Sequence, residues 1–366
     1  MAIYTFSFMS EDKPDDYIKG RGAQINTANR FLKRSFSVEH VEAIDEPMES
    51  NSKTQIFLEY PKKIVNKVES PDVYSQYSMN PYQGCEHGCI YCYARNTHEY
   101  WGFSAGLDFE RKIIAKPTAA ELLRKQFLNK NWEVQPIMFS GNTDCYQPLE
   151  RKMKFTRKML EVLLEFKHPV GMITKNSLIL RDTDILQELA KLKLVHVMVS
   201  ITSLSEDLRL AMEPRTATAK QRLKVIEELT KAGVPAGVMT APIIPGLNSH
   251  EMPAIIEQAA NNGAVNAGYT MVRLNGSIAE IFKDWIHKAF PDAAEKVLNQ
   301  IAEVHGGQLN DSRYGTRMRG EGNIADGIKA LFKAAVKKYL HGRRSYELDL
   351  TAFTRPTDNK GQFSLF

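Results

Sequence analysis

Three of the four cysteines of this 366-residue chain lie within eight residues, in the stretch Gly84-Cys-Glu-His-Gly-Cys-Ile-Tyr-Cys-Tyr93. Cys85, Cys89 and Cys92 therefore have the spacing Cys-x3-Cys-x2-Cys. Such crowding in a cysteine-poor chain differs from a secreted disulfide framework and indicates metal or redox chemistry in a reducing compartment. Thiolates at this spacing can hold either an iron-sulfur cluster or zinc.

These two kinds of metal site need different partners for the three thiolates. On a four-iron cluster three thiolates leave one iron open, as in a catalytic metal site. A structural zinc needs a fourth ligand, which His87 or His98 could supply. We favour the open cluster because no second cysteine pair follows, and because Gly84 and Gly88 allow a tight turn that aims backbone amides at the sulfides.

The elements that would position this loop follow from the alternation of short apolar runs with amphipathic segments. We expect six strands, at Tyr77–Pro81, Ile137–Ser140, Val170–Thr174, His196–Ile201, Ala236–Ala241 and Ala267–Arg273. Helices between them predict βαβ units, and therefore an α/β fold with a parallel sheet and right-handed crossovers. Functional sites of such folds collect at the carboxyl ends of the strands.

Start and stop signals predict where several helices begin and end. Thr118 and Glu121 match a capping box, and Asp182 precedes a short helix. Gly233 and Gly263 stand where helices should end, because glycine readily adopts the left-handed conformation found there.

Composition divides the chain into four stretches. Residues 1–74 are polar and irregular and predict an N-terminal extension, while residues 75–276 carry the alternating α/β pattern. We expect residues 277–350 to be helical, with a Gly-rich basic loop at Tyr314–Gly322, and residues 351–366 to form a flexible tail.

Composition also limits the class of protein. With 43% hydrophobic and 25% charged residues, the chain matches ordinary globular proteins. It shows neither a signal-peptide pattern nor an apolar run of the roughly 18 residues that cross a bilayer. We therefore expect a cytoplasmic protein with no membrane partner.

Charge is distributed unevenly along the chain. The net charge is +5, and the region from Asp311 onward accounts for all of it, with eleven basic and six acidic residues. There Arg313, Arg317 and Arg319 could track phosphates while Tyr314 stacks on a base, as in nucleic-acid-binding grooves. Solvated helix faces give similar counts, so the skew favours DNA as a partner without excluding that alternative.

The cysteine spacing, with an aromatic residue directly before the third cysteine, resembles the radical S-adenosylmethionine (radical SAM) superfamily over about residues 75–276. The resemblance implies a partial (β/α)6 TIM-like barrel and a [4Fe-4S] cluster held by Cys85, Cys89 and Cys92. It also implies that the amino and carboxylate groups of SAM chelate the fourth iron. With an electron from an external donor, SAM would give methionine and a 5'-deoxyadenosyl radical that removes hydrogen from the substrate.

The resemblance further implies which residues contact SAM. Tyr91 matches the aromatic position that flanks the adenine, and Lys175 and Ser200 stand at positions suited to the carboxylate and the ribose hydroxyls. The segment that receives the methionyl amino group comprises Ser140, Gly141, Asn142, Thr143 and Asp144. Carbonyls and a carboxylate suit an ammonium group. The structural alternatives are a turn role for Asp144, a solvated charge for Lys175 and a packed hydroxyl for Ser200.

Several short motifs are similar to the spore-photoproduct-lyase-like branch, which repairs a thymine photodimer in DNA. They are Cys89–Tyr93, Thr143-Asp144, Thr174-Lys175, Glu213–Thr216, Arg222-Leu223 and Ala232-Gly233. This branch implies a lyase-like, lesion-repair-like reaction on DNA. A radical SAM enzyme with a small-molecule or protein substrate, and a zinc-containing nucleic-acid-binding module, are the alternatives.

This chain departs from the branch at the residue that returns a hydrogen atom to the substrate radical. Repair there uses a cysteine thiol just upstream of the Thr/Ser-Asp pair, and in this chain that position is Gly141. The remaining cysteine, Cys145, lies four residues further on and is a candidate hydrogen donor or substrate contact, or an inert buried residue. Tyr93 is a second catalytic candidate, which could relay a radical or pack beside the cluster.

The last residues resemble the short peptide with which bacterial replication and repair proteins bind the DNA sliding clamp. An apolar pair would insert into a hydrophobic pocket while a glutamine bonds at the rim. The residues concerned are Gln362, Phe363, Leu365 and Phe366. Phe363 stands where leucine is usual, and the alternative is a terminus folded back onto its own core. We expect a monomer.

Overall fold

Six parallel strands lie side by side at the centre of the molecule. The computed structural model describes residues 17–31, 54–73, 75–343 and 346–356. The parallel strands are β3 (Tyr77–Met79), β6 (Ile137–Phe139), β7 (Val170–Thr174), β8 (Val195–Ser200), β9 (Ala236–Ile243) and β10 (Ala267–Met271). Their order is β10-β9-β8-β7-β6-β3, with antiparallel β2 (Val65–Lys67) beside β3. All six predicted strands are confirmed, and the sheet has two separate edges, as a partial barrel requires.

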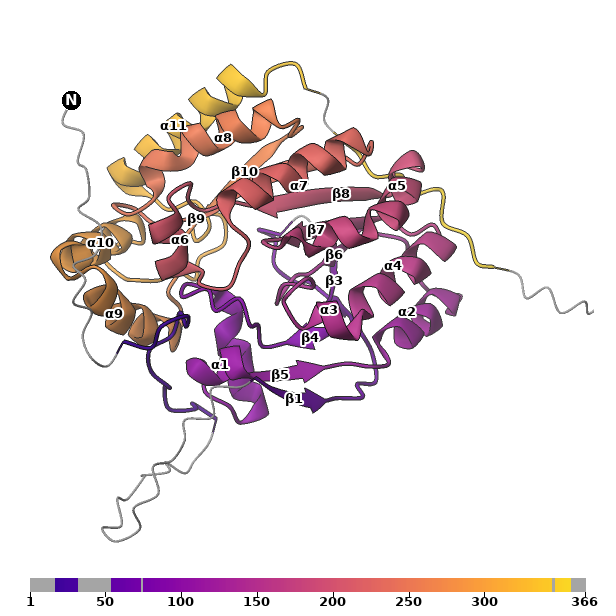
Figure 1. Cartoon of the computed structure of the whole chain (residues 1–366), viewed down its shortest axis with the longest axis horizontal. Helices are drawn as coiled ribbons and strands as arrows, with labels where there is room; N and C mark the ends of the chain where they lie inside the picture. The colour runs from indigo at the N-terminus through magenta and orange to yellow at the C-terminus, as the bar shows by residue number, and fades with distance from the viewer. Residues whose placement is uncertain (1–16, 32–53, 74, 344–345, 357–366) are drawn as a thin grey trace, which may run out of the picture.

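Helices connect these strands and cover the outer side of the sheet (Figure 1). The longer ones are α2 (Ala119–Leu128), α4 (Phe155–Glu165), α5 (Thr183–Lys191), α7 (Ala219–Lys231) and α8 (Met252–Asn261). The shorter ones are α3 (Glu150–Met153), η2 (Ser177–Asp182), α6 (Glu206–Met212) and η3 (Ser249–Glu251). Their apolar faces bury residues such as Leu163 and Ile226 in one core with Val197 and Val238 of the strands.

Helix ends partly match the predicted signals. Gly233 and Gly263 have φ of +76° and +93°, so the expected glycine stops are confirmed. The capping box predicted at Thr118 is wrong, because the Thr118 side chain makes no cap hydrogen bond. Asp182 also makes none, since its carboxylate accepts bonds from Arg157 and other side chains. The capping box that does form joins Thr218 to Gln221 at the start of α7.

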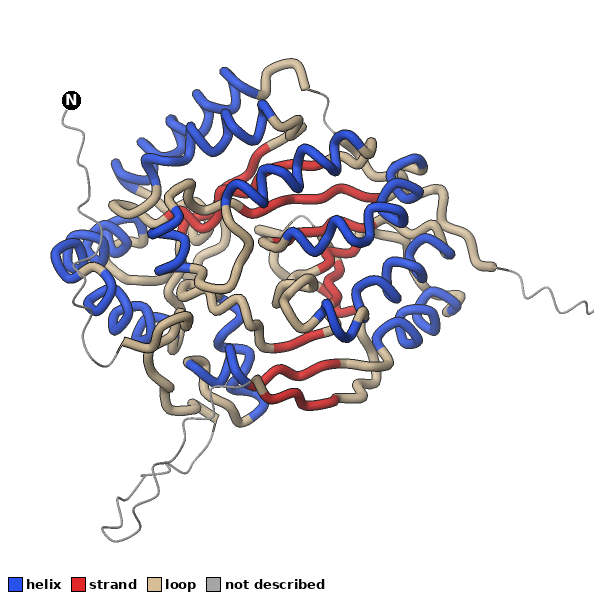
Figure 2. Tube along the Cα trace, viewed as in Figure 1, coloured by secondary structure: helices blue, strands red, loops and turns tan. Residues whose placement is uncertain are grey.

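A second, smaller sheet flanks the cysteine loop and is absent from the prediction. It has the order β1-β5-β4, with β1 (Gln55–Leu58), β5 (Lys112–Ala115) and β4 (Tyr82–Gln83). The 3-10 helix η1 (Tyr93–Trp101) and α1 (Leu107–Arg111) lie next to it. Figure 2 shows the two groups of strands, with loops gathered at the ends of the larger sheet. The region expected to be irregular thus contributes the short strands β1 and β2.

The C-terminal region is helical, as predicted. It contains α9 (Ile278–Ala289), α10 (Pro291–Val304) and α11 (Gly322–Tyr339), and α11 lies against α8 (Figure 1). None of the helices in the described ranges combines the length and the apolar character needed to span a bilayer. The terminal residues Gln362 to Phe366 lie outside the described residues.

Candidate active site at the cysteine loop

A cavity of about 460 Å³ opens at the carboxyl ends of the parallel strands, where the fold predicts a site. Its wall is built by the cysteine loop and by residues that lie in or directly after β6, β7, β8, β9 and β10. The predicted site residues that line it are Cys85, Cys89, Cys92, Tyr91, Tyr93, Ser140, Gly141, Asn142, Thr143, Asp144, Lys175 and Ser200. Strand order therefore brings together side chains that lie up to 115 positions apart in the sequence.

The cysteine loop is a tight, buried turn. Gly84 and Gly88 have φ of +74° and +69°, as expected for a loop that folds round a compact group. Cys85 and Cys89 are buried, and burial raises the pKa of both thiols. Three thiols facing one cavity from such a turn fit the ligand set of an iron-sulfur cluster, whose assembly must displace the thiol protons.

Part of the N-terminal region braces this loop from outside. The carboxylate of the fully buried Glu110 accepts the backbone N–H of Ala23 at 2.8 Å and the guanidinium of Arg95 at 2.6 Å. Gly22 lies so close that an added Cβ would stand 1.7 Å from the carbonyl oxygen of Gly88. The segment around Gly22 is therefore packed directly on the cluster loop.

Asp144 links the ends of β6 and β7. Its carboxylate accepts the Thr174 hydroxyl at 2.8 Å, the Lys175 backbone N–H at 2.8 Å and the Tyr146 backbone N–H at 2.9 Å. The carboxylate is thus engaged by internal donors, which favours the turn role over direct binding of an ammonium group.

Lys175 and Ser200 form a polar pair inside the cavity. The Lys175 Nζ donates to the Ser200 Oγ at 3.0 Å and lies 5.8 Å from the centre of the Tyr91 ring. Ser200 is buried and donates to the Ala241 carbonyl at 3.2 Å. Lys175 is therefore not a solvated surface charge, and both side chains point to the same region as Tyr91.

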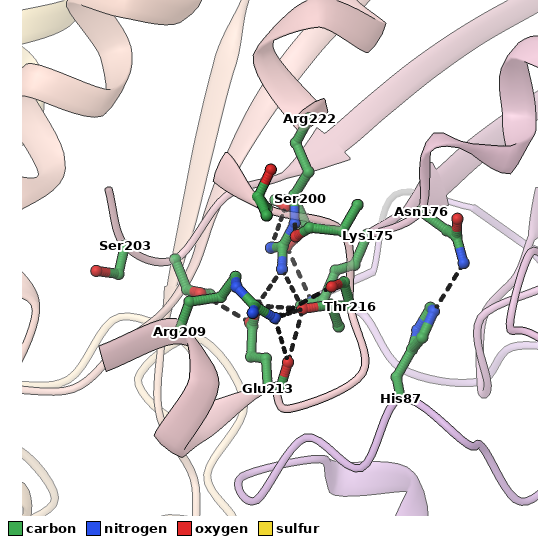
Figure 3. A network of polar contacts seen from close by, with 12 residues as sticks. His87, Lys175, Asn176, Ser200, Ser203, Arg209, Glu213, Thr216 and Arg222 are labelled. Carbon is green, nitrogen blue, oxygen red and sulfur yellow. Dashed lines mark hydrogen bonds and ion pairs between the residues drawn. The ribbon is translucent and has the colours of Figure 1, made fainter. Parts of the chain in front are cut away.

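A buried ionic network ties Tyr91 to this pair, and Figure 3 shows its members Glu213 and Arg222. Glu213 is fully buried and accepts the Tyr91 hydroxyl, the Thr202 hydroxyl at 2.7 Å and the Arg222 guanidinium at 2.5 Å. Arg222 also donates to the Ser200 carbonyl at 2.9 Å. Burial would raise the pKa of Glu213, but Arg222, Lys175 and the Tyr91 bond outweigh it and lower the pKa to about 2.

This network was missed as a functional unit from the sequence. Glu213 and Arg222 were visible only as parts of short motifs, and a Glu and an Arg nine residues apart carry no signal for pairing. The chain segment that contains Glu213 also bonds the cysteine loop, because the Ile90 backbone N–H donates to the Met212 carbonyl at 2.9 Å. The segment before α7 therefore holds both Tyr91 and the loop.

Comparison with known proteins places the chain in a family. The model of the radical SAM superfamily matches residues 79–259, which include the cysteine loop and most of the strands. The chain belongs to the radical SAM superfamily.

The chain is also similar to curated relatives and to solved structures. An uncharacterized protein of Mycobacterium tuberculosis (strain ATCC 25618 / H37Rv) is 31% identical over 238 residues, 64% of this chain and 70% of the relative. An uncharacterized protein of Methanocaldococcus jannaschii is 25% identical over 252 residues, 69% of this chain and 90% of the relative. A mutant spore photoproduct lyase with bound AdoMet and dinucleoside spore photoproduct has a TM-score of 0.58 and 14% identity, covering 78% of this chain and 79% of that one. At that identity the likeness shows the fold alone.

The contacts of the two histidines do not support the zinc hypothesis for this radical SAM chain. His87 is buried, with Nε2 3.2 Å from the Asn176 amide and Nδ1 3.4 Å from Asp144. His98 packs against Phe103 with a tilted ring and against Phe109 edge-on. Across the described ranges, no three His, Cys, Asp or Glu side chains are grouped to hold a single metal ion.

Cys145 does not lie with the other candidate site residues. It is fully buried in the apolar core of the main sheet and is not part of the cavity wall. Its backbone N–H donates to the Ser140 Oγ at 3.2 Å, and its carbonyl accepts the Thr156 hydroxyl at 2.6 Å. These bonds fix the backbone with the thiol in the core, so the structure does not support Cys145 as a hydrogen donor.

Gly141 has no room for a side chain. An added Cβ would stand 2.8 Å from the Ser78 Cβ, so no thiol fits at that position without a shift of β3. Instead the Tyr93 hydroxyl donates to the Gly141 carbonyl at 2.6 Å, and Tyr93 is 54% exposed in the cavity wall. Of the two catalytic candidates, only Tyr93 reaches the cavity.

The basic loop is more engaged than its charge suggests. Arg313 pairs with Asp311 and Glu321, and Arg319 donates to the Tyr269 carbonyl at 3.0 Å. Arg317 bonds Asp72 and Ser70 across the edge of the sheet. These internal partners weaken the prediction that the three arginines track phosphates.

Proposed function

We propose that Cys85, Cys89 and Cys92 hold a [4Fe-4S] cluster and that SAM binds beside it in the same cavity. When bound, the two would supply one-electron cleavage of the sulfonium to methionine and a 5'-deoxyadenosyl radical that removes hydrogen from the substrate. The observation that carries the proposal is that three thiols and the Lys175–Ser200 pair line one cavity. We propose that this occurs in the cytoplasm with an external electron donor, because thiolate ligands require a reducing compartment.

The chain's own residues would orient SAM in four ways. Lys175 offers an ammonium group to a carboxylate, and Ser200 offers a hydroxyl to a ribose. The segment after β6 offers backbone carbonyls to an ammonium group, while internal donors already engage the Asp144 carboxylate. Tyr91, held by Glu213, presents an aromatic face beside them.

We further propose that the substrate is a nucleic acid. An exposed tyrosine ring in the cavity wall suits stacking on a base. The fold is shared with a spore photoproduct lyase whose solved structure holds a dinucleoside lesion. A small molecule or a protein would remain as the substrate class if DNA fails the test below.

Replacing Cys89 by alanine is expected to abolish SAM cleavage. After anaerobic reconstitution and reduction with dithionite, the wild type should hold iron with stoichiometric sulfide and release 5'-deoxyadenosine. Cys89→Ala should release none above background, because a cluster iron loses its protein ligand. Cys145→Ala is the matched control and should retain activity, since Cys145 lies in the core. Zinc without sulfide in the wild type would contradict the proposal.

Tyr93→Phe is expected to block hydrogen return. We propose that the Tyr93 hydroxyl would give its hydrogen atom to the substrate radical, and that bound SAM would supply the hydrogen atom that restores the hydroxyl. With irradiated DNA and deuterated SAM, the wild type should exchange label between substrate and SAM, and Tyr93→Phe should lower this at least about tenfold. Equal exchange in both proteins would exclude this role, and no exchange with any DNA would exclude the DNA substrate.

The sliding-clamp hypothesis also stays a proposal, since it rests on residues outside the described ranges. Deleting Gln362 to Phe366 should abolish capture of the protein by an immobilised clamp, because the apolar anchor is lost. SAM cleavage serves as the control and should be unchanged. Absence of capture with the intact chain would end this hypothesis.

A further inference from the structure

One cation of the cavity wall has no hydrogen-bond or ion-pair partner among the residues that the structure describes. Arg273 follows β10, lines the cavity and is half-buried. Within the described ranges its guanidinium makes no hydrogen bond, ion pair or ring contact. The other Lys and Arg side chains of the wall are engaged, Lys175 with Ser200 and Arg317 with Asp72. Arg273 is therefore the cation of this wall that is open to a ligand.

Nearby carboxylates compensate the charge of Arg273 only in part, because other donors already bind them. Asp72 accepts the Gly315 backbone N–H at 2.7 Å together with Arg317. Asp311 accepts Arg313 at 2.9 Å and the Thr316 hydroxyl at 2.8 Å. Burial and the charge of Arg317 lower the pKa of Arg273, as expected for a guanidinium without a counterion. An anion entering the cavity would relieve this unfavourable charge.

The position of Arg273 separates it from the pair proposed to contact SAM. Lys175 follows β7 and Arg273 follows β10, with β8 and β9 between them. Neighbouring strands lie about 4.8 Å apart, so the two strands are separated by roughly 14 Å along the sheet. Lys175 and Arg273 therefore enter the cavity wall from strands three places apart in the sheet, so each can take a separate anion.

The surroundings of Arg273 suit a nucleotide. The same wall presents the exposed ring of Tyr93 and the thioethers of Met271 and Met318, which are flat or adaptable apolar surfaces. An apolar surface beside one unpaired guanidinium can take a base together with its phosphate. We propose that Arg273 binds a phosphodiester of the substrate. This inference rests on the proposed function, since it requires a nucleic-acid substrate in this cavity.

The test compares two probes that differ only in charge: single-stranded hexathymidylate and its uncharged methylphosphonate counterpart. On the reconstituted protein, Arg273→Met should weaken binding of hexathymidylate about tenfold or more, as loss of a charge-assisted hydrogen bond predicts. Binding of the uncharged probe should not change, and Arg273→Lys should keep most of the affinity for the charged one. The control Lys329→Met removes the same charge from an exposed position of α11 and should affect neither probe.

SAM binding to the same variants completes the test, because SAM also carries a carboxylate. Its affinity should be equal in the wild type and in Arg273→Met. A loss confined to SAM would assign Arg273 to the cofactor and overturn the inference. Unchanged binding of hexathymidylate by Arg273→Met would overturn it while leaving a nucleic-acid substrate in place. If the wild type binds neither oligomer, the nucleic-acid substrate fails and the Arg273 assignment fails with it.

Discussion

Gly22→Ala is expected to loosen the cluster loop and to destabilise the protein by about 3 kcal/mol, at the upper end of overpacking effects. The added Cβ would stand 1.7 Å from the Gly88 carbonyl oxygen and 2.9 Å from its carbon. Both are backbone atoms, so no side-chain rotation relieves the clash. Either the segment around Gly22 or the loop between Cys85 and Cys89 must move. Iron content after reconstitution should fall several-fold, and thermal denaturation should show the lost stability.

The control for this substitution is Gly327→Ala. Gly327 lies in α11, where an added Cβ meets nothing within 4 Å. Alanine there should be neutral or stabilising by up to about 1 kcal/mol, because glycine is a poor helix former. Wild-type iron content and melting temperature in Gly22→Ala would show that the N-terminal segment does not brace the loop.

Glu213→Gln is expected to have the second large effect. The substitution keeps the shape of the side chain but leaves the Arg222 guanidinium and the Lys175 ammonium without their buried countercharge. Removing one partner of a buried pair typically costs about 3–5 kcal/mol. Because Glu213 also holds Tyr91, SAM affinity should fall together with the free energy of unfolding. Chemical denaturation and equilibrium SAM binding measure the two effects.

The difference in the free energy of unfolding between the wild type and Glu213→Gln should also depend on pH. The pKa of Glu213 is about 2 in the folded protein and 4.5 for an ordinary glutamate, so its charge stabilises the fold fully above about pH 4.5. That contribution is lost as the pH falls towards 2. The stability gap between wild type and Glu213→Gln should therefore close over this interval, and a gap that stays constant would contradict the assigned charge.

Two further variants show how much of the stability lost in Glu213→Gln comes from the broken charge pair. Glu165→Gln disrupts a surface pair with Arg124 and should cost at most about 1 kcal/mol. Combining Glu213→Gln with Arg222→Met should restore part of the stability, because the unpaired cation is removed as well. Additive losses in the double variant would mean that the two residues act independently.

Local patterns in the sequence were sufficient to predict the chemistry of the cysteine loop and the fold class. Three cysteines within eight residues must lie close together in any fold. The alternation of apolar runs and amphipathic segments predicts a parallel sheet, whose strand ends meet at one edge. This is why Ser140, Lys175 and Ser200 could be assigned to one site from their places at the ends of successive strands.

Contacts between distant segments were decided only by the tertiary structure. Gly22 meets Gly88, and Tyr91 meets Glu213 across 122 positions of sequence, and no local pattern encodes either contact. Cys145 lies beside Asp144 in sequence, yet its thiol lies in the core because backbone bonds at the end of β6 orient it there. Whether a charge is paired depends on which groups surround it after folding. For that reason the sequence directed attention to the arginines of the basic loop, whereas the structure leaves Arg273 free in the cavity.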